Sequence, residues 1–254
     1  MKVTFLGTGT SQGVPVIACE CEICTSSDKR NNRLRSSVMI ETQGKVIVID
    51  SGPDFRYQML REKVHQLDAI LITHEHKDHI AGLDDVRAFN FKHDREIDVY
   101  AEERVQNALK NEFSYIFSGM KYPGLPRVIL HHIKEEGMNV QGVDITPIRA
   151  LHYKLPVYGF RIGDFTYITD AKTISEEEKE KIKGSKVLVL NALRRDEHIS
   201  HFTLEEAITL AQEIGAEKTY LTHISHQLGL HTDVEAELPE GVYLAYDRLS
   251  LSIE

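Results

Sequence analysis

A seven-residue run directly after an apolar segment restricts this chain more than any other feature. Residues 73–79 read Thr-His-Glu-His-Lys-Asp-His and follow residues 69–72, Ala-Ile-Leu-Ile, which is typical of a buried strand. The metal-ligating side chains of the run are His74, His76, Asp78 and His79. The first two are two residues apart, so in an extended chain they point the same way, and the other two follow in a turn. Imidazole and carboxylate groups together suit zinc, manganese and iron, so the run predicts a loop that can begin two adjacent metal sites.

Strand-like runs occur in both halves of the chain, with helical segments between them. Hydrophobic periodicity and turn residues predict strands at 2–6, 37–42, 45–49, 69–72, 97–101, 128–133, 138–148, 157–162, 165–169, 186–190, 218–222 and 242–244. The predicted helices are 54–64, 82–89, 102–111, 175–182, 203–214 and 225–237. Thr203 and Glu206 have the spacing of a capping box. Two mixed sheets with outer helices account for this order better than one parallel sheet.

Length and charge limit the domain count and the partners. The 254 residues contain no Pro/Gly/Ser linker, repeat or low-complexity tract, so we expect a single domain over residues 1–254. The 30 basic against 39 acidic residues give a formal net charge of −9, which argues against a broad nucleic-acid-binding face. No apolar stretch approaches the roughly 20 residues that span a bilayer, and the N-terminus is too polar for a signal peptide. We therefore expect a cytoplasmic protein without a membrane partner.

The pattern H-x-H-x-D-H resembles the signature loop of the metallo-β-lactamase superfamily. This resemblance implies an α/β (α+β) fold, a four-layer αββα sandwich of two mixed β-sheets flanked by helices, with two ions at the loop edge between the sheets. It also implies ligands at the ends of later strands, and the candidates in the expected order are His152, Asp170 and His223. By the same resemblance, one ion is held by His74, His76 and His152. The other is held by Asp78, His79 and His223, and Asp170 bridges the two.

Asp50 ends the apolar run 45–49 and precedes Ser51-Gly52. The superfamily pattern has an aspartate at this strand end, where it supports the histidine loop from behind. A plain turn residue before a glycine is an equally good interpretation of Asp50.

The only cysteines of the chain indicate a second kind of metal site. Cys19, Cys21 and Cys24 have the spacing C-x-C-x-x-C, and an odd number of cysteines does not suggest a disulfide framework. Three thiolates form a tetrahedral zinc site that lacks one ligand, for which His226 and His231 are the candidates. The alternative is free thiols in a flexible loop, or a redox site. We expect a structural zinc loop at about residues 15–35, because so long a loop needs something to hold it.

Residues 6–15, Leu-Gly-Thr-Gly-Thr-Ser-Gln-Gly-Val-Pro, followed by these cysteines, are similar to the phosphodiesterase branch of the superfamily. The resemblance covers nearly the whole chain and is greatest to the phosphoribosyl 1,2-cyclic phosphate phosphodiesterases. It implies that His226 completes the cysteine site and that the active-site ions are manganese or zinc, although iron and nickel also suit such ligands. It further implies a histidine that points into the site without binding metal. His201 fits this position, because a threonine follows two residues later at a helix start, and His198 is its competitor.

These implications predict hydrolysis of a small cyclic phosphate such as phosphoribosyl 1,2-cyclic phosphate. A hydroxide shared by two ions beside Asp170 would attack phosphorus, with Asp78 among the metal ligands. A His201 imidazole protonated near neutral pH would stabilise the phosphoryl group and the leaving alkoxide.

Two alternative functions follow from the same family. A tRNA 3′-processing endonuclease needs a protruding Gly/Pro-rich basic arm, but residues 118–127 carry few charges and fit a lid or dimer contact better. A non-hydrolytic accessory protein of cofactor biosynthesis is the other alternative. The loops at 89–95 and 114–126 would select the substrate, and a homodimer is plausible from the family.

Overall fold

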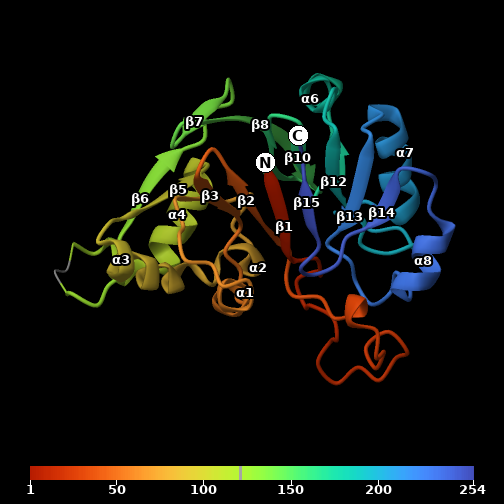
Figure 1. The fold of residues 1–254 in the computed structure, drawn as a ribbon, viewed down its shortest axis with the longest axis horizontal. Coiled ribbons are helices and arrows are strands. Elements are labelled where there is room, and N and C mark those ends of the chain that lie inside the picture. Colours follow the sequence, from red (N-terminus) through yellow and green to blue (C-terminus); the bar gives the residue numbers. More distant parts are fainter. Residues whose placement is uncertain (120–121) are drawn as a thin grey trace.

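Two β-sheets pack against each other in the computed structural model, which describes residues 1–119 and 122–254 (Figure 1). The first sheet contains, in spatial order, β15 (Ser250–Ser252), β1 (Lys2–Gly7), β2 (Ser37–Thr42), β3 (Lys45–Ile49), β4 (Ala69–Leu71), β5 (Ile97–Ala101) and β6 (Val128–His132). The second contains β11 (Thr173–Ile174), β8 (Val143–His152), β9 (Leu155–Ile162), β10 (Phe165–Tyr167), β12 (Val187–Asn191), β13 (Lys218–Thr222) and β14 (Val242–Leu244). A further strand, β7 (Met138–Val140), pairs with β8. Both sheets mix parallel and antiparallel pairs.

Helices lie on either side of this pair of sheets (Figure 1). On the side of the first sheet are α1 (Phe55–Arg61), α2 (Lys77–Ile80), α3 (Arg87–His93), α4 (Glu103–Glu112), α5 (Ser114–Phe117) and the 3₁₀ turn η2 (Leu83–Val86). On the side of the second are α6 (Glu176–Ile182), α7 (Leu204–Ile214) and α8 (His231–Glu237). Another 3₁₀ turn, η1 (Lys29–Asn31), lies in the long loop between β1 and β2.

The alternation of side chains along each strand explains the layers. In β3, Ile47 and Ile49 join the core between the two sheets, whereas Val48 packs into the core under the helices. In β12, Val189 faces the core between the sheets and Leu188 packs under the outer helices. Each sheet is therefore buried on both faces, and the predicted four-layer αββα fold is confirmed.

Several predicted element boundaries were wrong. Residues 138–148 are not one strand, because Gln141 and Gly142 adopt φ angles of 54° and 96° and form the tight turn between β7 and β8. The predicted helix at 225–237 begins only at His231, since the preceding residues form a turn and a loop with Gly229 at φ 127°. Four short elements, β11, β15, α2 and α5, were not predicted, because two to four residues show no readable period.

The predicted capping box is present at the start of α7. Thr203 accepts a hydrogen bond from the Glu206 amide, and the Glu206 carboxylate accepts one from the Thr203 amide. This cap fixes the point where the loop carrying His198 and His201 enters the helix.

Two residues of the expected lid and substrate loop, Met120 and Lys121, lie outside the described residues. Among the helices that are described, none is long and apolar enough to cross a membrane.

Candidate functional site

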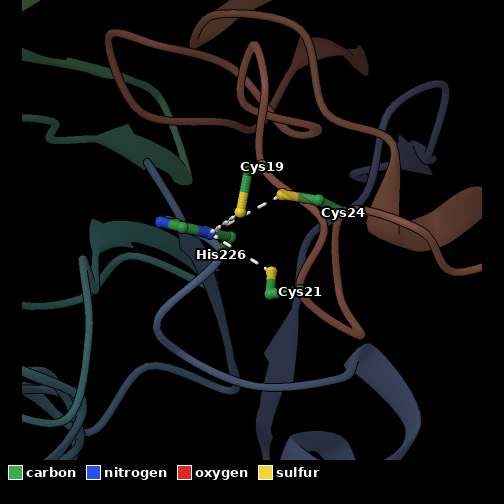
Figure 2. A group of neighbouring side chains, drawn as sticks. All are labelled: Cys19, Cys21, Cys24 and His226. Atoms are coloured by element: carbon green, nitrogen blue, oxygen red, sulfur yellow. Dashed lines mark hydrogen bonds between the residues drawn. The ribbon is translucent and has the colours of Figure 1, made fainter.

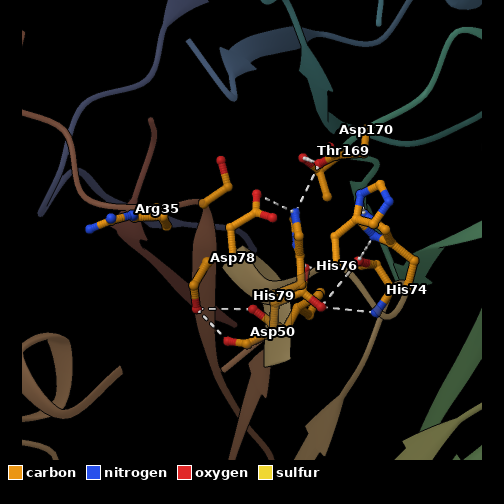
Figure 3. Close-up of polar contacts among 12 residues, drawn as sticks. Arg35, Asp50, His74, His76, Asp78, His79, Thr169 and Asp170 are labelled. Carbon is orange, nitrogen blue, oxygen red and sulfur yellow. Dashed lines mark hydrogen bonds and ion pairs between the residues drawn. The ribbon is translucent and has the colours of Figure 1, made fainter. Parts of the chain in front are cut away.

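The ligand-type side chains predicted from the sequence gather where strands of both sheets end (Figure 3). The loop after β4 supplies residues 74–79, β8 ends on His152, and His223 directly follows β13. Asp170 follows β10 by three residues. Parallel strands carry their carboxyl ends to the same edge of a sheet, and two packed sheets then bring two such edges together. His74 and His223, which are almost 150 residues apart in sequence, thus meet in one cluster.

Three residues of this region hold left-handed backbone conformations. The φ angles of Asp50, Asp170 and His223 are 65°, 54° and 56°. Such a conformation costs a non-glycine residue about 1–3 kcal/mol and tends to persist at functional sites. At Asp50 and His223 it directly follows a strand, and at Asp170 it comes three residues after one. In each case it turns the side chain away from the alternation of the strand.

One group of side chains surrounds a point beside His79. The Nε2 atom of His79 lies 3.0 Å from Oδ2 of Asp78 and 3.3 Å from Oδ2 of Asp170. The same Asp170 oxygen lies 3.2 Å from Nδ1 of His223. The four residues each offer one ligand atom, and these atoms all lie within 4.8 Å of one another.

A second group lies next to the first. Nε2 of His74 is 3.0 Å from Nδ1 of His76, and the ring of His152 is centred 5.1 Å from that of His76 and 5.8 Å from that of His74. His152 also approaches Asp170, since both belong to a set of ligand atoms within 4.8 Å. The third member of that set is His201, so Asp170 faces the first group and His152 of the second. This is the position that the superfamily resemblance implies for a bridging carboxylate.

Asp50 fixes the histidine loop from behind. Its carboxylate is fully buried and accepts hydrogen bonds from the Thr73 amide at 2.9 Å and from the Thr73 hydroxyl at 2.9 Å. It also accepts a bond of 2.7 Å from Nδ1 of His79. Because the Thr73 hydroxyl donates to Asp50, it accepts from Nδ1 of His74 at 2.9 Å. The hydrogen-bond network thus assigns the proton of both rings to Nδ1 and leaves their Nε2 lone pairs directed into the cluster.

The surroundings of these Nε2 atoms show whether the cluster suits a cation. Nε2 of His79 is buried without a hydrogen-bond partner among the described residues and faces carboxylates that cannot donate. Burial disfavours the charged ring, but the carboxylates of Asp78, Asp170 and Asp50 outweigh it and hold the pKa of His79 well above its usual value. The cluster therefore demands a positive charge at this point, either a proton or a metal ion. His152 shows the same arrangement, since its Nδ1 donates to the Ser200 carbonyl at 2.8 Å. The donor set fits two divalent ions.

His201 lies beside the cluster. Its Nδ1 is 3.7 Å from Oδ1 of Asp170, and its ring is centred 4.5 Å from that of His152 and 4.9 Å from that of His223. Burial lowers the pKa of His201 to about 3, so the expected protonation near neutral pH is wrong for the protein without ions or substrate. A neutral ring still has one N–H to donate. The ring of His198 is centred 5.0 Å from that of His201, and within the described residues its hydrogen bonds are to Ser200 of the same loop.

The three cysteines meet His226 at the base of the loop between β1 and β2 (Figure 2). The distances from Nδ1 of His226 to the sulfurs of Cys19, Cys21 and Cys24 are 3.3, 3.4 and 3.6 Å. A zinc tetrahedron with Zn–S bonds of about 2.3 Å and a Zn–N bond of about 2.0 Å has S···N edges of about 3.5 Å, so the four atoms fit zinc. The backbone amide of Cys24 and the His226 ring lower the pKa of Cys21 to about 6, whereas burial raises the pKa of Cys24 to about 11.

His231, the other candidate for the fourth ligand, lies elsewhere. Its amide donates to Asn31 at 2.9 Å, and its Nδ1 lies 3.1 Å from a guanidinium nitrogen of the buried Arg33. His231 thus helps to anchor the end of the cysteine loop, and the structure places His226 alone of the two beside the sulfurs.

Replacing Cys24 with serine is expected to remove one zinc ion per chain and to lower the melting temperature by roughly 5–10 °C. The loop would lose the ion that cross-links it to the segment after β13, which we take to be worth about 2–3 kcal/mol. Elemental analysis and calorimetry measure both effects. Thr25→Ser, next to the same cysteine, is the matched control, and an unchanged zinc content in Cys24→Ser would contradict the proposed site.

Comparisons with known proteins give the family. A family model described as the β-lactamase superfamily domain matches residues 45–224. A solved structure described as a new diphosphatase from the PhnP family superposes with a TM-score of 0.93 at 40% identity, covering 100% of this chain and 98% of that one. An octanoyltransferase of Porphyromonas gingivalis is 42% identical over 258 residues, which are 100% of this chain and 52% of that protein. A ribonuclease Z of Synechocystis is 26% identical over 245 residues, covering 84% of this chain and 69% of that protein.

The chain therefore belongs to the β-lactamase superfamily, whose fold it shares. Within that superfamily it is a member of the phosphodiesterase branch, a group of metal-dependent hydrolases. The chain spans about half the length of the P. gingivalis protein.

Proposed function

We propose that this chain is a two-metal phosphodiesterase that opens a small cyclic phosphate, with phosphoribosyl 1,2-cyclic phosphate as the specific candidate. The observation that carries the proposal is the place of Asp170, because this one buried carboxylate lies beside Asp78, His79 and His223 of one ligand group and beside His152 of the other. Two ions on either side of a shared carboxylate are suited to the displacement of one oxygen of a phosphodiester by another.

Each residue of the cluster then has a role in this chemistry. One ion would be held by His74, His76 and His152, and the other by Asp78, His79 and His223, with Asp170 common to both. Ions bound there would polarise the phosphoryl oxygens and make hydroxide available near neutral pH. Asp50 orients His79 and, through Thr73, His74. His201 lies where its N–H can donate to a phosphoryl oxygen and stabilise the charge that develops there.

We further propose that residues 1–254 act as one domain, with the zinc loop at about 15–35 as part of it. The core between the sheets draws side chains from β1 near the start of the chain and from Ile253 near its end. The Met1 amine also donates to the Ile253 carbonyl at 2.9 Å. These contacts support a unit whose first and last strands pair with each other.

Phosphorus NMR of the manganese- or zinc-supplemented protein tests the activity. The substrates are phosphoribosyl 1,2-cyclic phosphate, a 2′,3′-cyclic nucleotide, a linear diester and a dinucleotide diphosphate, the last because a similar protein is described as a diphosphatase. We expect opening of a cyclic phosphate by the wild type and none by Asp78→Ala, which lacks one metal ligand. Turnover of the diphosphate alone would mean that the two-metal site hydrolyses a phosphoanhydride, and it would overturn the cyclic phosphate as the substrate.

A tRNA-processing function is the second candidate, supported by the similarity to ribonuclease Z. The net charge of −9 makes it weaker, because phosphate backbones bind best to basic surfaces. Adding a tRNA precursor with a 3′ extension to the same assay separates the two functions. Failure to turn over any of these substrates with both ions bound would favour the non-hydrolytic accessory protein.

A further inference from the structure

The ion proposed for His74, His76 and His152 depends on the alignment of two sheets. His74 and His76 follow β4 of the first sheet, whereas His152 ends β8 of the second. Between His76 and His152 the chain runs through 75 other residues. Their rings must nonetheless stay about as close as the observed 5.1 Å between centroids for one ion to reach both.

Arg104, in the first turn of α4, contacts both sides of this ligand group. One guanidinium nitrogen, Nη1, forms an ion pair with Glu75, the residue between His74 and His76. The other, Nη2, donates to the Pro156 carbonyl at 2.7 Å. Pro156 of β9 pairs with Leu151 of β8, and Leu151 is the residue directly before His152.

The chemistry of the side chain suits this position. A guanidinium is a rigid planar group that can donate in several fixed directions at once, whereas a lysine ammonium holds one point. Arg104 also donates through Nε to Glu102 at 3.3 Å, which fixes the plane of the group. The Oε2 atom of Glu75 is buried and has no hydrogen-bond partner in the described part of the chain, so Arg104 is what orients this carboxylate.

Stability alone does not explain this pair. The side chains of Arg104 and Glu75 are 34% and 23% exposed, and ion pairs with such access to water contribute little to folding free energy. A geometric role is different, because partners that orient metal ligands affect metal affinity much more strongly than they affect stability.

We infer that Arg104 is a positioning residue that ties Glu75 to Pro156 and thereby sets the spacing of His74 and His76 against His152. The inference rests on the metal site of the proposed function but not on any particular substrate. It predicts that one of the two active-site ions depends on Arg104 and that the other does not.

Metal binding by Arg104→Met and Arg104→Lys tests this role. The purified proteins would be dialysed against graded concentrations of free Mn²⁺ and the bound ions counted. We expect Arg104→Met to weaken one ion by about 10–100-fold and Arg104→Lys to weaken it less, since lysine can still pair with Glu75. The second active-site ion and the cysteine-bound zinc should be retained. Arg87→Met is the matched control, because Arg87 pairs with Asp84 on the neighbouring surface.

Cobalt substitution adds a readout that a purely structural role would not change. The absorption bands of Co²⁺ report the geometry of its ligands, and Asp78→Ala identifies the bands of the ion that Asp78 holds. The bands that Asp78→Ala leaves intact then belong to the ion proposed for His74, His76 and His152. We expect Arg104→Met to alter these bands. Glu75→Gln should reproduce the effect, and the double variant should add little to it.

Two outcomes would overturn the inference. Metal affinities and cobalt spectra equal to those of the wild type would show that Arg104 does not position the ligands. Equal weakening of both active-site ions and the zinc would show a general loss of structure. Neither outcome depends on turnover, so a failure of the proposed phosphodiesterase activity would remain distinguishable from a failure of this role.

Discussion

Asp170→Asn is expected to lower diester turnover by at least about 10³-fold and to reduce the number of ions in the active site from two to one or none. The carboxylate is 2% exposed, and its Oδ2 approaches His79 and His223 while its Oδ1 faces His201. An asparagine of the same shape would keep one carbonyl oxygen and place an amide NH₂ where the second oxygen stood. It could therefore not offer a negative oxygen to each ion.

Asp164→Asn is the matched control for this variant. Asp164 lies in the turn between β9 and β10 and pairs with Lys186 at 3.0 Å on the surface, so its replacement should leave turnover and metal content unchanged. Metal content by elemental analysis and initial rates measure both proteins. Full activity with two bound ions in Asp170→Asn would show that this residue is not shared between the ions.

The loop 73–79 shows how much of the site could be predicted from the sequence. Its four ligands lie within six residues, so their proximity is a local property that spacing reveals. His152, Asp170 and His223 are single residues at strand ends, and only the family order singled them out. They reach the cluster because the two sheets pack face to face. Local sequence patterns do not predict this packing.

Contacts between distant residues were the part that sequence reasoning missed. Arg104 is an ordinary arginine in the first turn of a helix, and nothing in its neighbourhood indicates that it reaches Glu75 and Pro156. The neutral state of His201 was likewise hidden, since burial depends on the packing of loops from both sheets. Local patterns did place many elements: the predicted bounds of β2, β3, β5, β13 and β14 agree with the structure, and α7 with its capping box starts one residue later than predicted.

His201→Ala is expected to lower turnover by about 10²-fold or more while both active-site ions remain bound. The ring approaches Asp170, His152 and His223 but lies outside the two ligand groups proposed to hold the ions. Burial lowers the pKa of His201 to about 3 in the protein without ions or substrate, and an uncharged ring still has one N–H to donate. A phosphoryl oxygen that gains negative charge in the transition state would strengthen this bond, which is why the effect should fall on kcat more than on KM.

His198→Ala provides the comparison that decides this assignment, because the two histidines share one loop. His201 is buried and approaches Asp170 to 3.7 Å, whereas His198 is half-buried and contacts Ser200. We expect His198→Ala to retain kcat within about threefold, because the hydrogen bonds of His198 in the described part of the chain are to Ser200 and not to the ligand cluster. Elemental analysis of both variants separates catalysis from metal binding. Loss of an ion from His201→Ala would make His201 a ligand, a role that the short distances among His152, Asp170 and His201 also permit. Retained ions with lost turnover would establish it as the group that acts on the substrate.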